Sequence, residues 1–251
     1  MSKSLLGKVA LVTGGSRGLG AATAAALADQ GADVAISYVA SQDKALNVVK
    51  VLKAKGVRAV AFKADQGDVS QSEPLIRSVV EQLGKLDILV NNAAIALQGM
   101  AIDDAEIDNA AMDRQWAINV AGVIANIRAA VKVLPEGGRI ISVGSGLGSR
   151  VLFPGTTDYA GTKAAIVGYT KGASRDLGPR NITVNVVQAG MMDTDMAAGS
   201  RGKLPPIIMD SHAIRRFALV EEVAAAIVFL AGPDAGYITG TTLDVNGGYT
   251  A

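Results

Sequence analysis

The chain has 251 residues, 49% of them hydrophobic, which is enough for one large α/β domain with a substantial core. Its 24 Lys and Arg residues balance 23 Asp and Glu residues, so it lacks the basic stripe of a nucleic-acid-binding protein. The absence of cysteine excludes disulfides, zinc–thiolate sites and cysteine nucleophiles. Because the apolar runs are short or interrupted by charges and no signal-peptide pattern is present, we expect a cytoplasmic protein that does not span a membrane.

Segments typical of strands and of helices alternate along the chain, with no linker or repeat between them. The expected strands cover residues 9–13, 34–38, 59–63, 88–90, 139–143, 182–187 and 242–245. The expected helices cover residues 21–30, 42–55, 72–83, 112–134, 156–177 and 220–230. This alternation predicts one α/β domain over residues 1–251, with a doubly wound, seven-stranded parallel sheet and helices on both faces. Ligands of such sheets bind at the carboxyl ends of the strands.

A glycine-rich turn follows the first expected strand and leads into an Ala-rich helix. It reads Thr13-Gly14-Gly15-Ser16-Arg17-Gly18-Leu19-Gly20, a G-x-x-x-G-x-G spacing. Glycines permit a tight turn and a close approach of the backbone to phosphate, and the helix N-terminus attracts an anion. This turn therefore predicts a seat for the pyrophosphate of a dinucleotide.

The end of the second strand bears on the choice of dinucleotide. An acid there would hold the ribose 2′-hydroxyl of NAD and repel a 2′-phosphate. The chain reads Tyr38-Val39-Ala40-Ser41 instead, with no acid before Asp43. Arg17 offers a cation and Ser41 a hydroxyl to a phosphate, which favours NADPH. In the alternative, Arg17 is a solvated side chain and the protein is an NAD-linked dehydrogenase.

Two further stretches lie at strand ends. Asp65, after the third strand, is placed to accept a hydrogen bond from the adenine amino group, unless it is an ordinary loop or helix-start aspartate. The fourth strand ends in Asn91-Asn92-Ala93-Ala94, whose small residues let the backbone lie against a ribose or a ring, although the Asn pair alone indicates only a turn.

Tyr159 and Lys163 stand four residues apart in an expected helix, so their side chains share one face. An unperturbed tyrosine, with a pKa of about 10, is a poor acid or base at neutral pH. We expect the neighbouring ammonium to lower the pKa of Tyr159 by favouring the phenolate. A tuned proton donor and a dinucleotide seat together indicate hydride transfer to or from a carbonyl.

Over essentially its whole length the chain resembles the short-chain dehydrogenase/reductases. The motifs that carry the resemblance are the glycine turn, residues 91–94, Asn119 within Ala117-Ile118-Asn119-Val120, Ser145, Tyr159-Ala160-Gly161-Thr162-Lys163, and residues 185–194. The resemblance implies a Rossmann fold and a catalytic tetrad of Asn119, Ser145, Tyr159 and Lys163. Tyr159 would protonate the carbonyl oxygen, Ser145 would orient that oxygen, and Lys163 would bind the nicotinamide ribose. Asn119 would hold a water that connects Lys163 to solvent.

Some of these assignments have alternatives. Asn119 could be a buried helix asparagine satisfied by backbone groups. Ser142, within the strand, and Ser149, further along the loop, compete with Ser145, which stands just past the strand end. The resemblance also implies a set of cofactor contacts. They are Gly14, Ser16, Arg17, Leu19, Gly20, Tyr38, Ala40, Ser41, Asp65, Gln66, Asn92, Ala93, Ala94, Tyr159, Lys163, Gly190, Met192 and Thr194, with no metal.

The expected substrate pocket is walled by residues 95–102, 147–155 and 196–217, and the segment 195–217 reads as an apolar lid. These walls favour a hydrophobic or cyclic ketone or an acyl thioester. Similarity is greatest to 3-oxoacyl-(acyl-carrier-protein) reductases and related carbonyl reductases. Of the two basic positions for carrier docking in that group, Arg180 matches one and Glu136 replaces the other. We expect His212 on the surface and Trp116 in the core or a subunit contact.

The resemblance further implies a homotetramer that forms through residues 112–134 and 156–177. A different class of function, a non-catalytic protein that senses NADP, remains the main alternative to an enzyme. Such a protein would not need a Tyr/Lys pair, and all four tetrad positions are filled here. Sugar-nucleotide epimerases share the Tyr/Lys spacing but carry a larger C-terminal domain.

Overall fold

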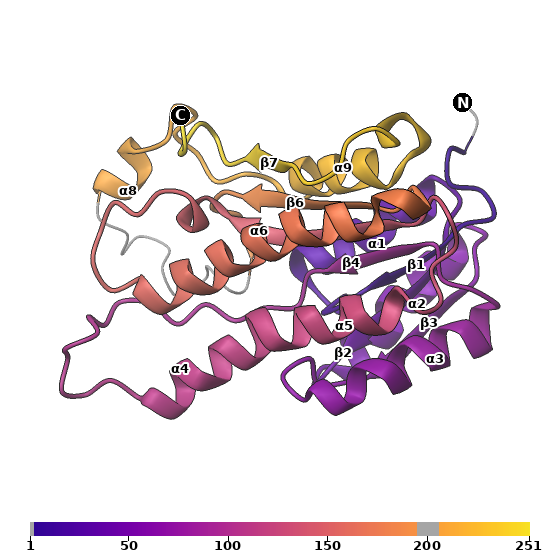
Figure 1. The fold of residues 1–251 in the computed structure, drawn as a ribbon, viewed down its shortest axis with the longest axis horizontal. Helices are drawn as coiled ribbons and strands as arrows, with labels where there is room; N and C mark the ends of the chain where they lie inside the picture. The colour runs from indigo at the N-terminus through magenta and orange to yellow at the C-terminus, as the bar shows by residue number, and fades with distance from the viewer. Residues whose placement is uncertain (1–2, 195–205) are drawn as a thin grey trace.

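The computed structural model describes residues 3–194 and 206–251, and their strands form a single parallel sheet (Figure 1). The strands are β1 Val9–Val12, β2 Asp33–Tyr38, β3 Ala59–Lys63, β4 Ile88–Asn91, β5 Arg139–Ser145, β6 Thr183–Ala189 and β7 Thr242–Val245. Their order is β3-β2-β1-β4-β5-β6-β7. Each neighbouring pair is parallel, as in β1 and β4, where Ala10 pairs with Ile88. The predicted doubly wound Rossmann sheet is confirmed.

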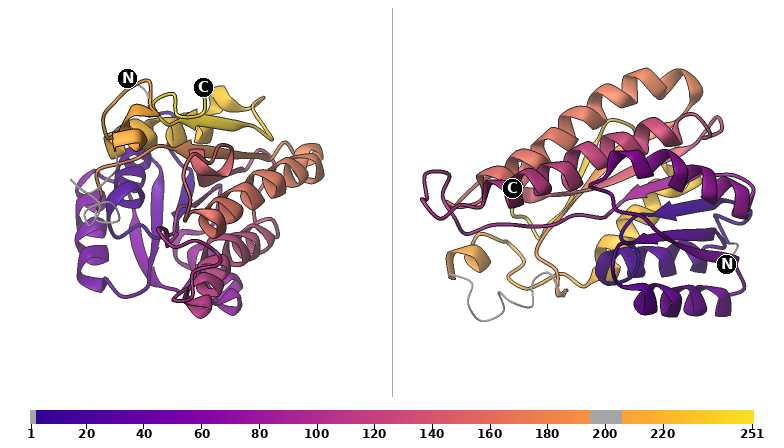
Figure 2. Two further views of the ribbon diagram at one scale, coloured as in Figure 1. Left: turned by 90° about the vertical axis from the view of Figure 1, so that its left-hand side faces the viewer. Right: turned by 90° about the horizontal axis from the view of Figure 1, so that it is seen from below.

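Helices cover both faces of the sheet, as the edge-on view in Figure 2 shows. One layer holds α1 Gly18–Asp29, α2 Gln42–Ala54 and α9 Val220–Ala231. The opposite layer holds α3 Ser72–Leu83, α4 Asn109–Trp116, α5 Gly122–Ala130 and α6 Thr157–Leu177, and a short helix, α8 Pro206–Asp210, precedes α9. No helix within residues 3–194 and 206–251 is long and apolar enough to cross a membrane.

The central strands β1 and β4 are buried at every residue, so their sequences are nearly continuous apolar runs. Alternate side chains point to opposite faces of the sheet. In β1, for example, Val9 and Leu11 belong to the core beneath α3, α5 and α6, whereas Ala10 and Val12 belong to the core beneath α1, α2 and α9. The two cores hold the sheet rigidly between the helix layers, which fixes the positions of the loops at its carboxyl end.

The long helix expected over residues 112–134 is in fact three segments. It begins earlier, as α4, passes through a π-helical turn at Ala117–Ala121 and continues as α5. The turn meets the loop after β3 closely: a Cβ on Gly122 would lie 1.9 Å from the backbone oxygen of Gln66. π-Helical turns concentrate at functional sites, and this one contains Asn119.

Candidate active site

The glycine turn forms a concave surface at the N-terminus of α1 that only glycine can build. Gly14 and Gly18 have φ values of 65° and 52°. A Cβ on Gly14 would lie 2.9 Å from Cα of Ala93, and one on Gly20 would lie 2.4 Å from the oxygen of Gly14. Arg17, the N-cap, makes no capping hydrogen bond with its side chain. The turn therefore offers close backbone approach and helix N–H groups, which fits a pyrophosphate.

The end of β4 is fastened directly to this turn. Oγ1 of Thr13 accepts hydrogen bonds from the backbone N–H groups of Asn92 and Ala93, both at 3.0 Å. Nδ2 of Asn92 donates to the backbone oxygen of Thr13 at 2.8 Å. The predicted contacts Asn92, Ala93 and Ala94 thus lie beside the glycines, where a bound ribose would follow the pyrophosphate.

The end of β2 lies on the other side of the same turn. The backbone N–H of Gly15 donates to the oxygen of Ser37 at 3.0 Å, and that of Gly14 to its hydroxyl at 3.3 Å. Tyr38, half-buried, closes the strand, and the exposed Ala40 and half-buried Ser41 follow it. This edge carries no carboxylate before α2, so its chemistry suits a phosphorylated ribose.

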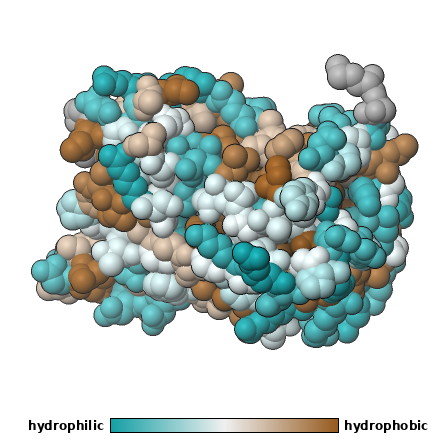
Figure 3. All heavy atoms as spheres, turned by 45° about the horizontal axis from the view of Figure 1, so that its top comes forward, coloured by the Kyte–Doolittle hydropathy of each residue, from teal (hydrophilic) through white to brown (hydrophobic). Residues whose placement is uncertain are grey.

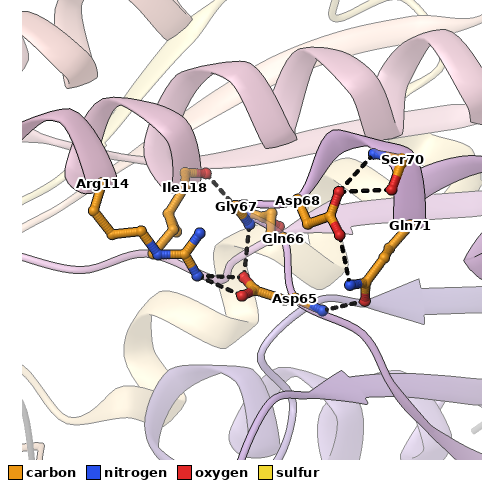
Figure 4. Close-up of polar contacts among 8 residues, drawn as sticks. All are labelled: Asp65, Gln66, Gly67, Asp68, Ser70, Gln71, Arg114 and Ile118. Atoms are coloured by element: carbon orange, nitrogen blue, oxygen red, sulfur yellow. Dashed lines mark hydrogen bonds and ion pairs between the residues drawn. The ribbon is translucent and has the colours of Figure 1, made fainter.

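The adenine side differs from the sequence-based expectation in one respect. Asp65 lies after β3 as expected, but its carboxylate is paired with Nη2 of Arg114 at 2.6 and 2.5 Å (Figure 4). Arg114 was not predicted. Both Nε2 hydrogens of Gln66 are used within the protein, on the oxygens of Ala93 and Ile118, and Oε1 accepts from Asn126. The side chain of Gln66 therefore has no free donor for a cofactor.

The side chain of Leu19 is also unavailable, because it is 5% exposed and packs in the core. Its backbone N–H, in the first turn of α1, is the group of Leu19 that could contact a phosphate. Ser16 and Arg17 are more open, half-buried and exposed respectively. After β6, Gly190 donates to the oxygen of Val245 and Met192 forms a bridge with Ala218.

Thr194 closes the site from the side of β6. Its Cγ2 atom lies 3.5 Å from the position of a Cβ on Gly18. The segment after β6 therefore lies next to the glycine turn at the carboxyl end of the sheet.

Ser145 and Tyr159 meet at the carboxyl end of the sheet. Ser145 is the last residue of β5, and Tyr159 lies in the first turn of α6, with the Ser145 hydroxyl close enough to act on the pKa of the Tyr159 hydroxyl. The two competing serines have other environments. Ser142 is 1% exposed within β5 and has no hydrogen-bond partner among the described residues, and Ser149 pairs with Gln188. Only Ser145 of the three is paired with Tyr159.

Lys163 lies one turn after Tyr159 and is 4% exposed. Its Nζ donates to the backbone oxygen of Val143 at 3.0 Å and lies 5.6 Å from the centre of the Tyr159 ring. Burial lowers the pKa of Lys163 to about 8. Lys163 is thus held next to Tyr159, and at neutral pH its ammonium form is only weakly favoured over the neutral amine.

The expectation that Lys163 lowers the pKa of Tyr159 is wrong for this arrangement. Burial raises the pKa of Tyr159 to about 12, and the hydrogen bond with Ser145 acts in the opposite direction without offsetting it. Burial disfavours a phenolate more than the ammonium near its ring favours it. Tyr159 is therefore a protonated phenol at neutral pH, the form that can donate a proton.

The side chain of Asn119 matches the structural alternative. Its Nδ2 donates to the oxygen of Ile95 at 2.9 Å and to Oγ1 of Thr162 at 3.2 Å, and its Oδ1 accepts from the N–H of Ile95 at 3.0 Å. Asn119 therefore fastens the loop after β4 to α6, the helix that carries Tyr159.

Comparison with known proteins agrees with this geometry. The model of a family described as Enoyl-(Acyl carrier protein) reductase matches residues 14–250. A 3-oxoacyl-(acyl-carrier-protein) reductase of Staphylococcus aureus is 39% identical over 243 residues, which cover 96% of this chain and 97% of that protein. The chain belongs to the short-chain dehydrogenase/reductase family. It is an oxidoreductase, as the sequence predicts.

Two other similar proteins are informative. A crystal structure of a short-chain dehydrogenase from Burkholderia cenocepacia in complex with NADP superposes with a TM-score of 0.93 at 45% identity, covering 99% of this chain and 100% of that chain. A cyclic-di-GMP-binding biofilm dispersal mediator protein of Escherichia coli is 39% identical over 246 residues, 98% of each chain.

The two loops predicted to wall the substrate pocket, after β4 and β5, are in contact. The N–H of Gly99 donates to the oxygen of Gly155 at 2.7 Å, which joins the walls predicted at residues 95–102 and 147–155. Ile102, Val151 and Leu152 on these walls are exposed, and brown apolar side chains appear between polar ones at the left of Figure 3. Of the predicted lid, residues 195–205 lie outside the described residues, and residues 206–217 contain α8.

One residue departs from expectation. His212 is not on the surface: it is 6% exposed and its ring lies 5.1 Å from that of Tyr249. Trp116 is 37% exposed in the single chain and donates to Asp158 at 2.7 Å, so of its two predicted places the core is excluded and a subunit contact stays a prediction. Arg180 donates to the oxygens of Val131 and Leu134 at the end of α5. Arg180 lies just before β6, so the length of that strand, about 20 Å, separates it from the carboxyl end of the sheet where the candidate site lies.

Proposed function

We propose that this protein is an NADPH-dependent carbonyl reductase in which Tyr159 is the general acid. The observation that carries the proposal is the Ser145–Tyr159 hydroxyl pair, located at the same end of the sheet as the glycine turn. A tyrosine whose pKa is about 12 keeps its proton at neutral pH, and reduction of a ketone requires a proton donor for the oxygen. Oxidation of an alcohol would require the phenolate, which burial disfavours.

NADPH fits the residues at the strand ends. The glycine turn would hold the pyrophosphate, Asp65 would accept from the adenine amino group, and Arg17 and Ser41 would contact the 2′-phosphate. Residues 92–94 and 190–194 would line the ribose and nicotinamide. The lack of an acid at the end of β2 and the NADP complex of the Burkholderia cenocepacia relative support this choice.

The cofactor, when bound, supplies the hydride, and the protein positions the ketone and supplies the proton. Ser145 would hydrogen-bond the carbonyl oxygen and hold it against the Tyr159 hydroxyl, which would pass its proton to that oxygen. Lys163 would hold the ribose hydroxyls with its ammonium. Both hydrogens on Nδ2 of Asn119 are donated within the protein. A water between Lys163 and solvent would therefore be held by the side-chain and backbone carbonyl oxygens of Asn119.

The substrate class follows from the exposed apolar side chains on the two loops after β4 and β5. We propose a hydrophobic or cyclic ketone, or a 3-oxoacyl thioester as in the Staphylococcus aureus relative. A small thioester fits better than one on a carrier protein, because Arg180 is engaged with the end of α5 and Glu136 accepts from Asn181. A homotetramer and a cytoplasmic location are further parts of this proposal.

The test is initial-rate oxidation of NADPH and of NADH with an acetoacetyl thioester and with cyclic ketones. We expect kcat/KM to be about a hundredfold higher with NADPH, as for a charge-assisted contact to the 2′-phosphate. Preference for NADH would contradict the cofactor choice. Tight NADPH binding without turnover on any ketone would favour a binding protein, the class named for the Escherichia coli relative.

The pH dependence of cofactor use follows from Lys163. Its pKa of about 8, against an ordinary value of 10.5, means that the ammonium loses its proton within the working range. We expect kcat/KM for NADPH to be level at low pH and to fall as the pH rises through about 8. The profile is measured with saturating ketone and with NADPH well below KM. A decline that begins only above about pH 10 would show that Lys163 titrates normally.

A further inference from the structure

The loop between β3 and α3 is held to α4 by an ion pair that has no part in the chemistry described above. Nη2 of Arg114 contacts both carboxylate oxygens of Asp65, and the side chains are 40% and 30% exposed. One turn further along the same helical segment, the oxygen of Ile118 accepts from Gln66 at 2.9 Å. Figure 4 shows the two contacts side by side, with the loop drawn against the helix.

The hydrogen bonds of Asp65 leave one defined acceptor. Oδ1 accepts from Arg114 at 2.6 Å and from the N–H of Gly67 at 2.9 Å, whereas Oδ2 accepts from Arg114 alone, at 2.5 Å. Each carboxylate oxygen accepts about two hydrogen bonds. The hydrogen bond from Arg114 holds the pKa of Asp65 below its ordinary value, so the carboxylate is charged at neutral pH. Oδ2 thus keeps one lone pair on a fixed, charged and partly exposed group.

We propose that Arg114 is a positioning residue for adenine recognition, which orients Asp65 so that Oδ2 receives the adenine amino group. This inference rests on the proposed NADPH function and adds a residue to it. An unpaired aspartate on an exposed loop would sample several rotamers, and ordering it would reduce the affinity gained from the hydrogen bond. Arg114 reduces that cost because it contacts both carboxylate oxygens from a helix that borders the site, five residues before Asn119.

Gly67 provides the space that Arg114 occupies. A Cβ on Gly67 would lie 1.9 Å from Nη1 and 2.5 Å from Cζ of the guanidinium, and 2.9 Å from Cγ1 of Ile118. Gly67 is not among the residues with a left-handed backbone, so alanine is compatible with its conformation. The substitution G67A would therefore displace the flexible guanidinium and leave every charged group in the chain.

The experiment compares NADPH with its reduced hypoxanthine analogue, in which an oxygen replaces the adenine amino group. Dissociation constants are measured by titration of cofactor fluorescence for the wild type, R114M, R114K, G67A and the control R77M. Arg77 is exposed on α3 and pairs only with Glu81 among the described residues, so R77M makes the same charge change elsewhere. We expect the wild type and R77M to bind NADPH about tenfold more tightly than the analogue, the effect of one hydrogen bond to a charged acceptor.

In R114M and G67A we expect this preference to fall to about twofold through weaker NADPH binding, with R114K intermediate, because an ammonium on a flexible stem pairs with the carboxylate but fixes it less rigidly. KM for NADPH rises and kcat is unchanged. If R114M and G67A keep the wild-type preference, the role of Arg114 is overturned while the assignment of NADPH stands. If the wild type binds NADPH but shows no preference, Asp65 does not recognise adenine and the inference also fails. If R114M does not fold, the binding preference of G67A decides whether Arg114 positions Asp65.

If the wild type does not bind NADPH at all, the proposed function fails first, and the inference with it. Absence of NADPH binding and loss of adenine preference are therefore separate results in the same titrations.

Discussion

Tyr159→Phe lowers kcat for ketone reduction by about a thousandfold, within the range expected for loss of a general acid. The substitution removes one hydroxyl and leaves the ring, which faces the ammonium of Lys163. It deletes the proton donor and the partner of Ser145 together. The dissociation constant of NADPH changes by no more than about threefold, because a single neutral hydrogen bond is lost from a large binding site. The measurement is a pair of steady-state and fluorescence titrations on the purified variant.

The matched control is Tyr169→Phe. Tyr169 lies on the same helix, three turns further on, in the groove between α5 and α6. The chemical change is identical, and kcat remains that of the wild type. Loss of a general acid lowers the rate by at least about a hundredfold. If Tyr159→Phe retained more than about a tenth of wild-type kcat, Tyr159 would therefore not be the proton donor.

Lys163→Met has the second-largest effect. It lowers kcat/KM for NADPH by about a hundredfold or more, because the site loses the charge that would hold the ribose hydroxyls. Methionine keeps much of the stem that packs below the site. The exposed Lys171 on the same helix supplies the control, since Lys171→Met removes the same charge away from the site. Activity of Lys163→Met close to that of Lys171→Met would exclude the role assigned to Lys163.

Stability changes in the opposite direction to activity. Because burial lowers the pKa of Lys163 in the folded state, the folded protein binds fewer protons than the unfolded chain between about pH 8 and 10.5. This contribution makes the wild type more stable as the pH rises through that range, and Lys163→Met lacks it. At pH 7 the variant is at least as stable as the wild type in thermal unfolding. A clear loss of stability would mean that the hydrogen bond to Val143, and not function, explains the buried lysine.

The sequence predicts the parts of the site that depend on local spacing. The glycine turn must combine positive φ values with close approach to Ala93, and only glycine meets both demands. The four-residue interval between Tyr159 and Lys163 is set by helical geometry. The continuous apolar strands locate the sheet, and hence the edge at which these groups meet.

The features that the sequence does not reveal depend on contacts between distant segments. Arg114 and Asp65 are 49 residues apart, and neither position carries a local signal for an ion pair. The π-helical turn at Asn119 adds its extra residue without changing the composition of the helix. The burial of His212 depends on Tyr249, which reaches it from the C-terminal segment. The raised pKa of Tyr159 likewise depends on burial, whereas the pattern of residues shows only the nearby charge.

The central claim is that hydride passes from NADPH to a ketone carbon while Tyr159 donates the proton. The direct measurement uses NADPH labelled with deuterium at one or the other position of C4, followed by mass spectrometry of the alcohol. We predict deuterium on the carbinol carbon from only one of the two labelled forms with the wild type, and no labelled alcohol with Tyr159→Phe over the same interval. Alcohol without deuterium from either form, or equal labelling from both, would contradict the account.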